Sequence, residues 1–176
     1  QAAVEKWRKA ATDAMRSLGR EYGEYWGRRA QLLVARASGD SAGDREVLLL
    51  TAKRLYLQQQ WDAAIDAYAQ AAAQAEAEGE PAAAIPYVQA AAQIELEQGR
   101  RQAAEDRLRD SALRLAAVPQ AAPLHWTSAL LAAQAVREDP SLLPHYEARL
   151  AEHAEKFASG AHAEEARFWL GRLRQQ

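Results

Sequence analysis

The four histidines of this sequence are the first candidates for metal binding or acid–base chemistry. They are His125, His145, His153 and His162, and the chain has no cysteine that could add a thiolate ligand. His145 and His153 lie eight residues apart, but the position four residues from each is Arg149. A pair of metal ligands one helical turn apart is therefore missing. We expect no metal site and interpret the histidines as ordinary surface or boundary residues.

Serine nucleophiles and phosphate-binding loops are not indicated either. None of the seven serines lies in a nucleophile-elbow motif, and no glycine-rich stretch has the spacing of a phosphate-binding loop. Carboxylates such as Glu95 and Glu97 would need a cleft and shifted pKa values for acid–base catalysis, and we interpret them as a solvated helix face. The sequence predicts neither an enzyme active site nor a cofactor site in these residues.

The charged residues are nearly balanced, with 22 Lys and Arg against 24 Asp and Glu and a net charge of -2. Arg107 and Arg109 alternate with Glu105, Asp106 and Asp110, which is typical of ion pairs on a helix surface. A nucleic-acid-binding protein usually carries a basic stripe, so we expect no nucleic-acid partner. No apolar run approaches the roughly 20 residues of a membrane span, and we expect no membrane insertion.

The elements that must position these side chains are predicted to be helices throughout. The chain has 43 alanines among 176 residues, and alanine is the strongest helix former. Apolar residues recur every three or four positions, and no stretch alternates as a strand would. Turn signals containing glycine or proline separate the periodic stretches. The predicted helices span residues 45–59, 61–78, 81–98, 101–117, 123–138, 140–158 and 161–174.

The N-terminal residues 1–37 form a separate predicted element, which an apolar stripe indicates to be one long helix or two helices. A loop at 38–44 follows it. Gly19, Gly23 and Gly27 share one helix face, where another backbone can approach closely. We expect a tight helix–helix contact or a helix break there. A self-association seam between two copies is the alternative.

The predicted helices repeat in pairs. Residues 58–68 align with residues 98–108 at an offset of 40 residues, and in each copy a helix ends, a short turn follows and a second helix begins. One hairpin cannot cover its own apolar faces, so neighbouring hairpins must stack. The pattern predicts a helical repeat array over 44–176, with units at 44–79, 80–118 and 123–158 and a partial unit at 161–176.

The run Trp61, Ala64, Tyr68 and Ala71 resembles the second helix of the tetratricopeptide repeat family, and Ala52 stands where the first helix of that family has a small residue. The stretch 166–171, Ala-Arg-Phe-Trp-Leu-Gly, is similar to the opening helix of a further repeat in bacterial envelope proteins of this superfamily. The spacing of 40 residues exceeds the usual repeat of about 34 residues, so the helices should be longer. Glu105, Arg107 and Pro144 also depart from the family pattern.

The resemblance implies an all-α, right-handed superhelix of antiparallel helix hairpins with a concave face that binds a partner. The residues that it places on this face belong to the first helix of each hairpin and point away from the second helix. They are Leu49, Lys53, Tyr56, Gln89, Gln93 and Leu96. Family members that clamp a C-terminal carboxylate use Lys and Asn on this face, and because the chain has no Asn we expect no such clamp.

We therefore expect a protein–protein interaction scaffold that binds a partner protein or peptide. A start without Met and an alanine- and arginine-rich composition indicate a fragment of a larger bacterial protein, and both the cytoplasm and the cell envelope are compatible with the sequence. One alternative is a structural spacer or self-association module that dimerises through the N-terminal element. Another is a docking or regulatory domain of a protein whose enzymatic part lies elsewhere. The five tryptophans are expected mostly in the core or between repeats, and the alternative for any exposed one is an anchor for a partner.

Overall fold

Most of the residues that the structure describes lie in helices, as the apolar periodicity of the sequence predicts. The computed structural model describes residues 14, 17, 20–23 and 41–175. This part of the chain contains no strand, so the predicted all-α fold is confirmed, and the helices begin and end within four residues of their predicted bounds. They are α3 (Ser41–Leu57), α4 (Trp61–Ala77), α5 (Pro81–Glu97), α6 (Arg101–Arg114), α7 (Ala121–Glu138), the short 3-10 helix η1 (Pro140–Leu142), α8 (Leu143–Lys156) and α9 (Ala163–Leu173).

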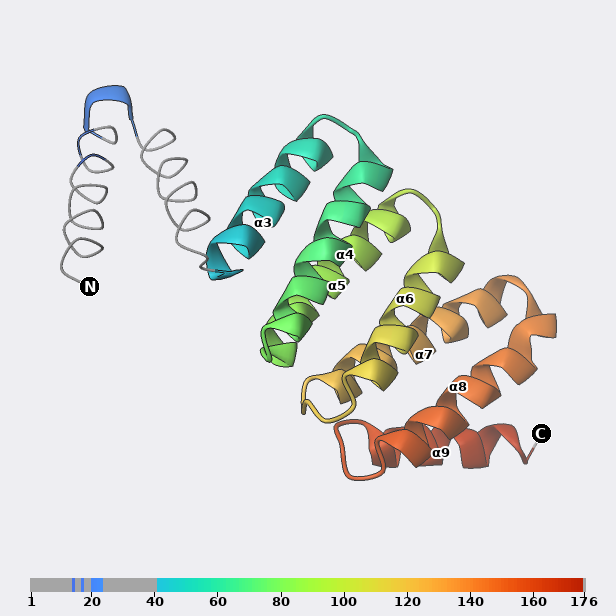
Figure 1. Ribbon diagram of the computed structural model, residues 1–176. Coiled ribbons are helices and arrows are strands. Elements are labelled where there is room, and N and C mark those ends of the chain that lie inside the picture. The colour runs from blue at the N-terminus through green and yellow to red at the C-terminus, as the bar shows by residue number, and fades with distance from the viewer. Residues whose placement is uncertain (1–13, 15–16, 18–19, 24–40, 176) are drawn as a thin grey trace.

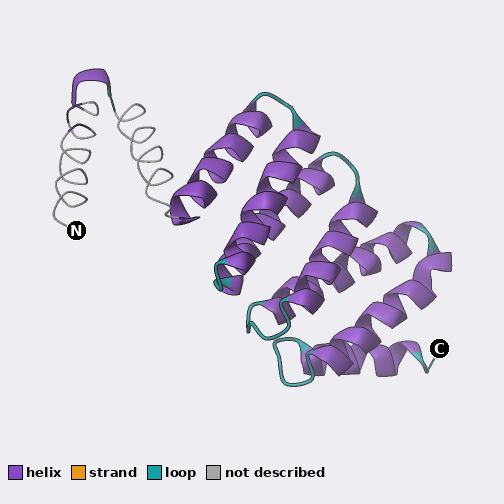
Figure 2. Cartoon of the chain, viewed as in Figure 1, coloured by secondary structure: helices purple, strands orange, loops and turns teal. Residues whose placement is uncertain are grey.

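Consecutive helices run antiparallel and form a stack of hairpins (Figures 1 and 2). The hairpins α3–α4, α5–α6 and α7–α8 lie side by side, and α9 follows them. Each helix packs against its neighbours in sequence, and α5 also contacts α7, the first helix of the next hairpin. Local packing of this kind is typical of repeat architectures, in which each unit contacts the adjacent ones.

Three of the turns between consecutive helices share one geometry. Gln59, Gly79 and Gly99 each adopt a left-handed conformation, with φ of 59°, 77° and 71°. In each turn the N–H of the next residue donates to the carbonyl five residues earlier, at N–O distances of 2.8–2.9 Å. This is a helix C-terminal motif that satisfies the last carbonyls and reverses the chain.

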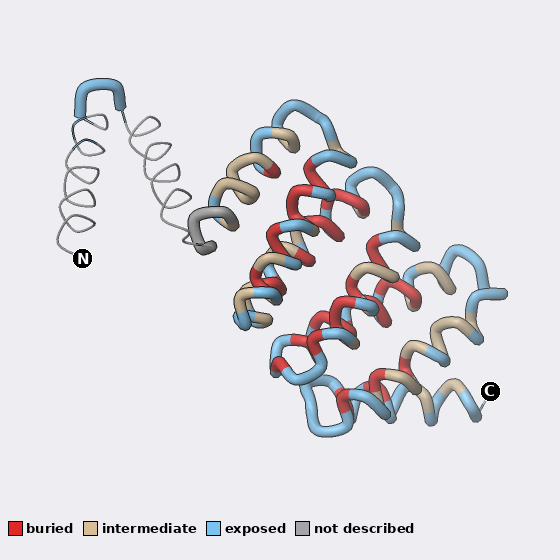
Figure 3. The backbone as a smooth tube through the Cα atoms, viewed as in Figure 1, coloured by how far each residue is buried: buried red, intermediate tan, exposed pale blue. Residues whose placement is uncertain are grey.

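The core consists of alanines and larger apolar side chains. The buried stretches of the backbone lie mainly in the middle of the stacked helices (Figure 3). Ala52, Ala64 and Ala71, the small residues of the repeat-like run, are fully buried. Trp126 is buried against Leu150 of α8, as expected for a tryptophan between repeats. The same expectation is wrong for Trp169, because the outer side of α9 is uncovered and this side chain is 40% exposed.

The predicted N-terminal element at 1–37, with Trp7, Trp26 and most of its glycine face, lies largely outside the described residues. Within it, Gly23 has a φ of 90°, which no continuous α-helix through this position would allow. None of the helices in the described ranges combines the length and the apolar character that crossing a bilayer requires. Pro144, a departure from the repeat pattern, lies in the first turn of α8, where proline is tolerated.

Candidate functional site

The six residues predicted on the concave face lie on α3 and α5 and differ in exposure. Lys53, Gln89 and Gln93 are exposed. Leu49 and Tyr56 are half-buried against the apolar cluster that α3, α4 and α5 share. Leu96 is also half-buried, but it packs against the cluster that extends to α6 and α7. Leu49 and Leu96 therefore contribute to packing, and the assignment of all six to a partner remains a prediction.

Two of the six, Tyr56 and Gln93, meet at a small open pocket between α3, α4 and α5. Its volume is about 190 Å³, which is below the roughly 300–1,000 Å³ of small-molecule sites and suits a single side chain. Lys53 does not line the pocket, although it lies one turn before Tyr56. The lining residues are Tyr56, Tyr68, Ala90, Gln93, Ile94 and Glu97.

Glu97 gives this pocket its polar character. One carboxylate oxygen, Oε2, accepts a hydrogen bond from the Tyr56 hydroxyl at 2.9 Å, and the other accepts from Gln93 Nε2 at 3.1 Å. The bond to Glu97 raises the pKa of Tyr56, so this hydroxyl keeps its proton. Both side chains are neutral, and none of the ion pairs between described residues involves Glu97. The pocket therefore has aromatic and aliphatic walls and an acidic rim.

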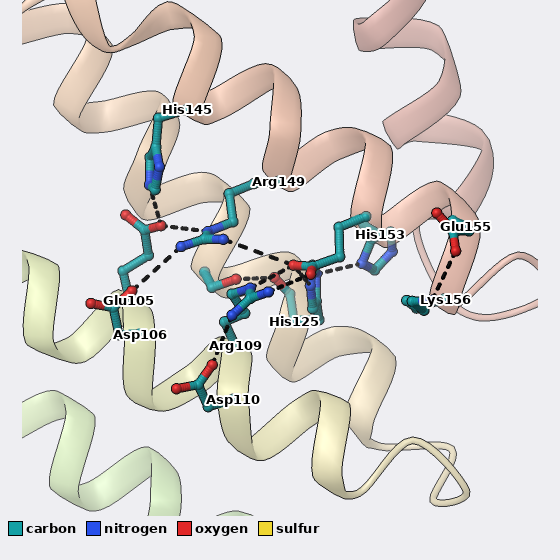
Figure 4. Close-up of polar contacts among 12 residues, drawn as sticks. Glu105, Asp106, Arg109, Asp110, His125, His145, Arg149, His153, Glu155 and Lys156 are labelled. Carbon is teal, nitrogen blue, oxygen red and sulfur yellow. Dashed lines mark hydrogen bonds and ion pairs between the residues drawn. The ribbon is translucent and has the colours of Figure 1, made fainter.

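A second cluster of polar side chains lies between α6, α7 and α8 (Figure 4). We call it the α6–α8 polar cluster. Glu105 is 1% exposed, and its Oε1 accepts from Arg149 Nε at 2.7 Å and lies 2.6 Å from His145 Nε2. Arg109 donates from Nε and Nη2 to the two oxygens of Glu152, at 2.6 and 2.5 Å. Its members are Glu105, Asp106, Arg109, His125, His145, Arg149, Glu152 and His153.

His125 and His153 lie at the buried end of this cluster with no exposed surface. Their Nδ1 atoms are 3.2 Å apart, and the Phe157 ring lies 5.1 and 5.4 Å from the two imidazole rings. Burial lowers the pKa of both imidazoles. The prediction that the histidines are surface or boundary residues is therefore wrong for these two, because the stacking of α7 on α8 encloses them.

The expectation of ion pairs confined to helix surfaces is also wrong. Glu95 was interpreted as solvated, yet it is 4% exposed and accepts two hydrogen bonds from Arg107 of the next helix, at 2.7 and 2.9 Å. Arg109 and Glu105 likewise bind α8 across the hairpins. The helix period places these residues on faces, but only the crossing of another helix decides which face is buried. Glu97, two residues on, is exposed as predicted.

Ion pairs also join successive hairpins at sequence separations close to one repeat. Arg100 pairs with Asp62 and Arg114 with Glu76, so both ends of α4 are tied to the hairpin of α6. Arg101 binds Glu138 through both carboxylate oxygens at 2.6 Å. Within the described ranges, no three or more His, Asp or Glu side chains are placed to hold a metal ion.

No protein-family model matches the chain, and no curated protein and no solved structure shows significant similarity to it. The likeness to tetratricopeptide repeats therefore rests on the residues alone.

Proposed function

We propose that the chain is a tetratricopeptide-like scaffold that binds an extended segment of a partner protein across α3 and α5. The observation that carries this proposal is the pocket at Tyr56, Gln93 and Glu97, where two predicted partner-binding residues meet. Its walls belong to three packed helices, so the site is formed before a ligand arrives. Binding to a preformed site avoids the entropic cost of ordering a loop.

The chemistry of the pocket favours a basic side chain of the partner. The pocket lining includes Tyr56, Tyr68 and Ile94, whose apolar surface suits the methylene stem of lysine or arginine. An ammonium or guanidinium group at the rim would contact Glu97 and an aromatic face together, and cation–π contacts at exposed sites contribute about 0.5–1 kcal/mol. The volume of about 190 Å³ accommodates one such side chain and not a larger ligand.

Peptide display against the purified chain tests this proposal. We expect an enriched motif with an invariant lysine or arginine. The enrichment should fall for Tyr56→Ala and for Glu97→Gln, and it should persist for Glu155→Gln, which removes an exposed carboxylate on α8. Leu96→Ala is a poor probe because Leu96 packs against the core. Enrichment of no motif, or of a motif that both pocket variants still select, would overturn the proposal.

A further inference from the structure

A chain of three hydrogen-bonding contacts runs through the buried histidine pair of the α6–α8 polar cluster. At one end His153 Nε2 lies 3.0 Å from the carbonyl oxygen of Ala161, in the turn between α8 and α9. In the middle the Nδ1 atoms of His153 and His125 are 3.2 Å apart. At the other end His125 Nε2 lies 3.0 Å from Glu152 Oε2.

Both ends of this chain are hydrogen-bond acceptors. A backbone carbonyl can only accept, so His153 must carry its proton on Nε2. Partial burial raises the pKa of Glu152, but hydrogen bonds from Arg109 and His125 outweigh it and lower the pKa to about 2. Glu152 is therefore a carboxylate at neutral pH and accepts from His125 Nε2.

Two neutral imidazoles do not carry enough N–H hydrogens to form all three contacts. Three contacts need three N–H hydrogens, and two neutral imidazoles supply two. If both Nε2 atoms are protonated, the two Nδ1 lone pairs face each other across 3.2 Å. If His125 carries its proton on Nδ1 instead, its Nε2 lone pair faces the Glu152 carboxylate. One added proton completes all three contacts, whereas a second would set two N–H groups against each other.

We propose that His125 and His153 form a buried site that binds one proton, with His125 as the imidazolium and His153 as the neutral Nε2–H tautomer. Glu152 places its negative charge beside His125 and favours this assignment. The pair therefore titrates as a unit, in two steps with well-separated pKa values. The first proton completes the three hydrogen bonds, whereas the second would place two N–H groups against each other.

The other charged and titratable groups around the pair are few. Arg109 of α6 is held by Glu152, and Arg149 of α8 lies between Glu105 and Glu152, 3.9 Å from the latter. The two guanidinium groups lower the pKa of His125, as burial does most strongly. His162, which precedes α9 and stacks on Trp126, acts on His153 in the same direction. His145 faces Glu105 at the far end of the cluster.

The bound proton has a structural consequence. Arg109–Glu152 ties α6 to α8, His125 belongs to α7, and His153 bonds the turn that leads into α9. The completed chain therefore connects four successive elements, although burial makes protonation of the pair less favourable in the folded chain than in the unfolded chain.

Side-chain ¹⁵N NMR of the intact chain between pH 8 and pH 5 tests the proposal, because the shift of each ring nitrogen reports whether it carries hydrogen. We expect one protonation step for the pair, in which His125 gains a second N–H while His153 keeps a single one on Nε2. Two rings that stay neutral throughout, or two that become imidazolium together in the folded chain, would overturn the proposal.

Glu152→Gln sharpens the test, because the amide can donate to His125 Nε2 and completes the chain without an added proton. In this variant His125 should carry its hydrogen on Nδ1, and its protonation step should move down by about one pH unit or more. Glu105→Gln is the matched control, since it neutralises another buried carboxylate of the same cluster that does not touch the pair. An unchanged His125 step in Glu152→Gln would contradict the proposal. Should that variant not fold, the wild-type spectrum still decides the proton count.

Discussion

Gln59 adopts a left-handed backbone conformation that glycine adopts at the equivalent positions of the next two turns, Gly79 and Gly99. Its φ of 59° is left-handed, which costs a residue with a Cβ roughly 1–2 kcal/mol, whereas Gly79 and Gly99 adopt the same conformation without that cost. Glycine also gains more freedom in the unfolded chain, which offsets part of the benefit. We predict that Gln59→Gly raises the free energy of unfolding by about 0.5–1 kcal/mol in urea denaturation. Gly99→Ala should lower it, and a gain in stability there would contradict this explanation.

The Glu95–Arg107 pair should stabilise the fold more than the exposed pairs do. Arg107→Ala leaves the Glu95 carboxylate buried without its two hydrogen bonds, so we predict a loss of about 1–3 kcal/mol in the free energy of unfolding. Arg101→Ala removes an equally well-formed bidentate pair on the surface and should cost clearly less, because solvent screens that pair. Chemical denaturation of the two variants compares them directly, and equal losses would contradict the assignment.

The sequence could not predict which charged residues are buried. Glu95 and Glu97 differ by two positions, so they lie on different sides of α5, but the helix period does not reveal where α6 will cross. Arg107 lies 12 residues away, on that crossing helix. The histidine pair is a stronger case, because 28 residues separate His125 and His153 and only the packing of α7 on α8 joins them. Glu97 was recognised as exposed, but not as the acidic rim of a pocket.

At the scale of elements, the helices and their turns were predictable because local rules determine them. Alanine content and apolar periodicity indicated the helices, and glycine or proline marked most of their ends. The largest differences in bounds occur at the start of α3, at the end of α6 and near Pro140, where a 3-10 turn precedes α8. Which helix faces meet depends on contacts between hairpins, which the sequence alone does not contain.

The packing of α7 on α8 should respond to pH through the histidine pair. Burial lowers the pKa of both imidazoles, so below pH about 6.5 the unfolded chain binds more protons on them than the folded chain does. Stability is therefore lost as the pH falls, by about 1.4 kcal/mol per pH unit for each proton by which the two states differ. Glu152 adds a further loss below pH about 4.5, since its folded pKa is about 2.

Denaturation curves between pH 7 and pH 5 measure this dependence. The double variant with His125→Gln and His153→Gln should lose most of the slope, whatever its absolute stability. The same slope in both proteins would show that the pair does not cause the pH dependence.

At the scale of the whole molecule, residues 41–175 form a stack in which each hairpin contacts its neighbours. Ion pairs tie one hairpin to the next. Asp62–Arg100, Glu76–Arg114 and Arg109–Glu152 all span about one repeat in sequence. This arrangement agrees with the hairpin array inferred from the 40-residue offset. A repeat pattern predicts the scaffold but does not identify its partner. The pattern arises from residues that pack between helices, whereas a partner contacts residues outside that packing.

The measurement that most directly tests the scaffold account is a double-mutant cycle between Glu97 and the basic residue of a display-selected peptide. Isothermal titration calorimetry would give Kd for the wild-type chain and Glu97→Gln, each with the peptide and with its Lys-to-Gln counterpart. We predict that each single change weakens binding about two- to fivefold, in keeping with an exposed charge pair that also contacts an aromatic ring. The two changes together should weaken binding little further, because they remove the same contact. Fully additive losses, or no loss from Glu97→Gln, would contradict binding of a basic side chain at this pocket.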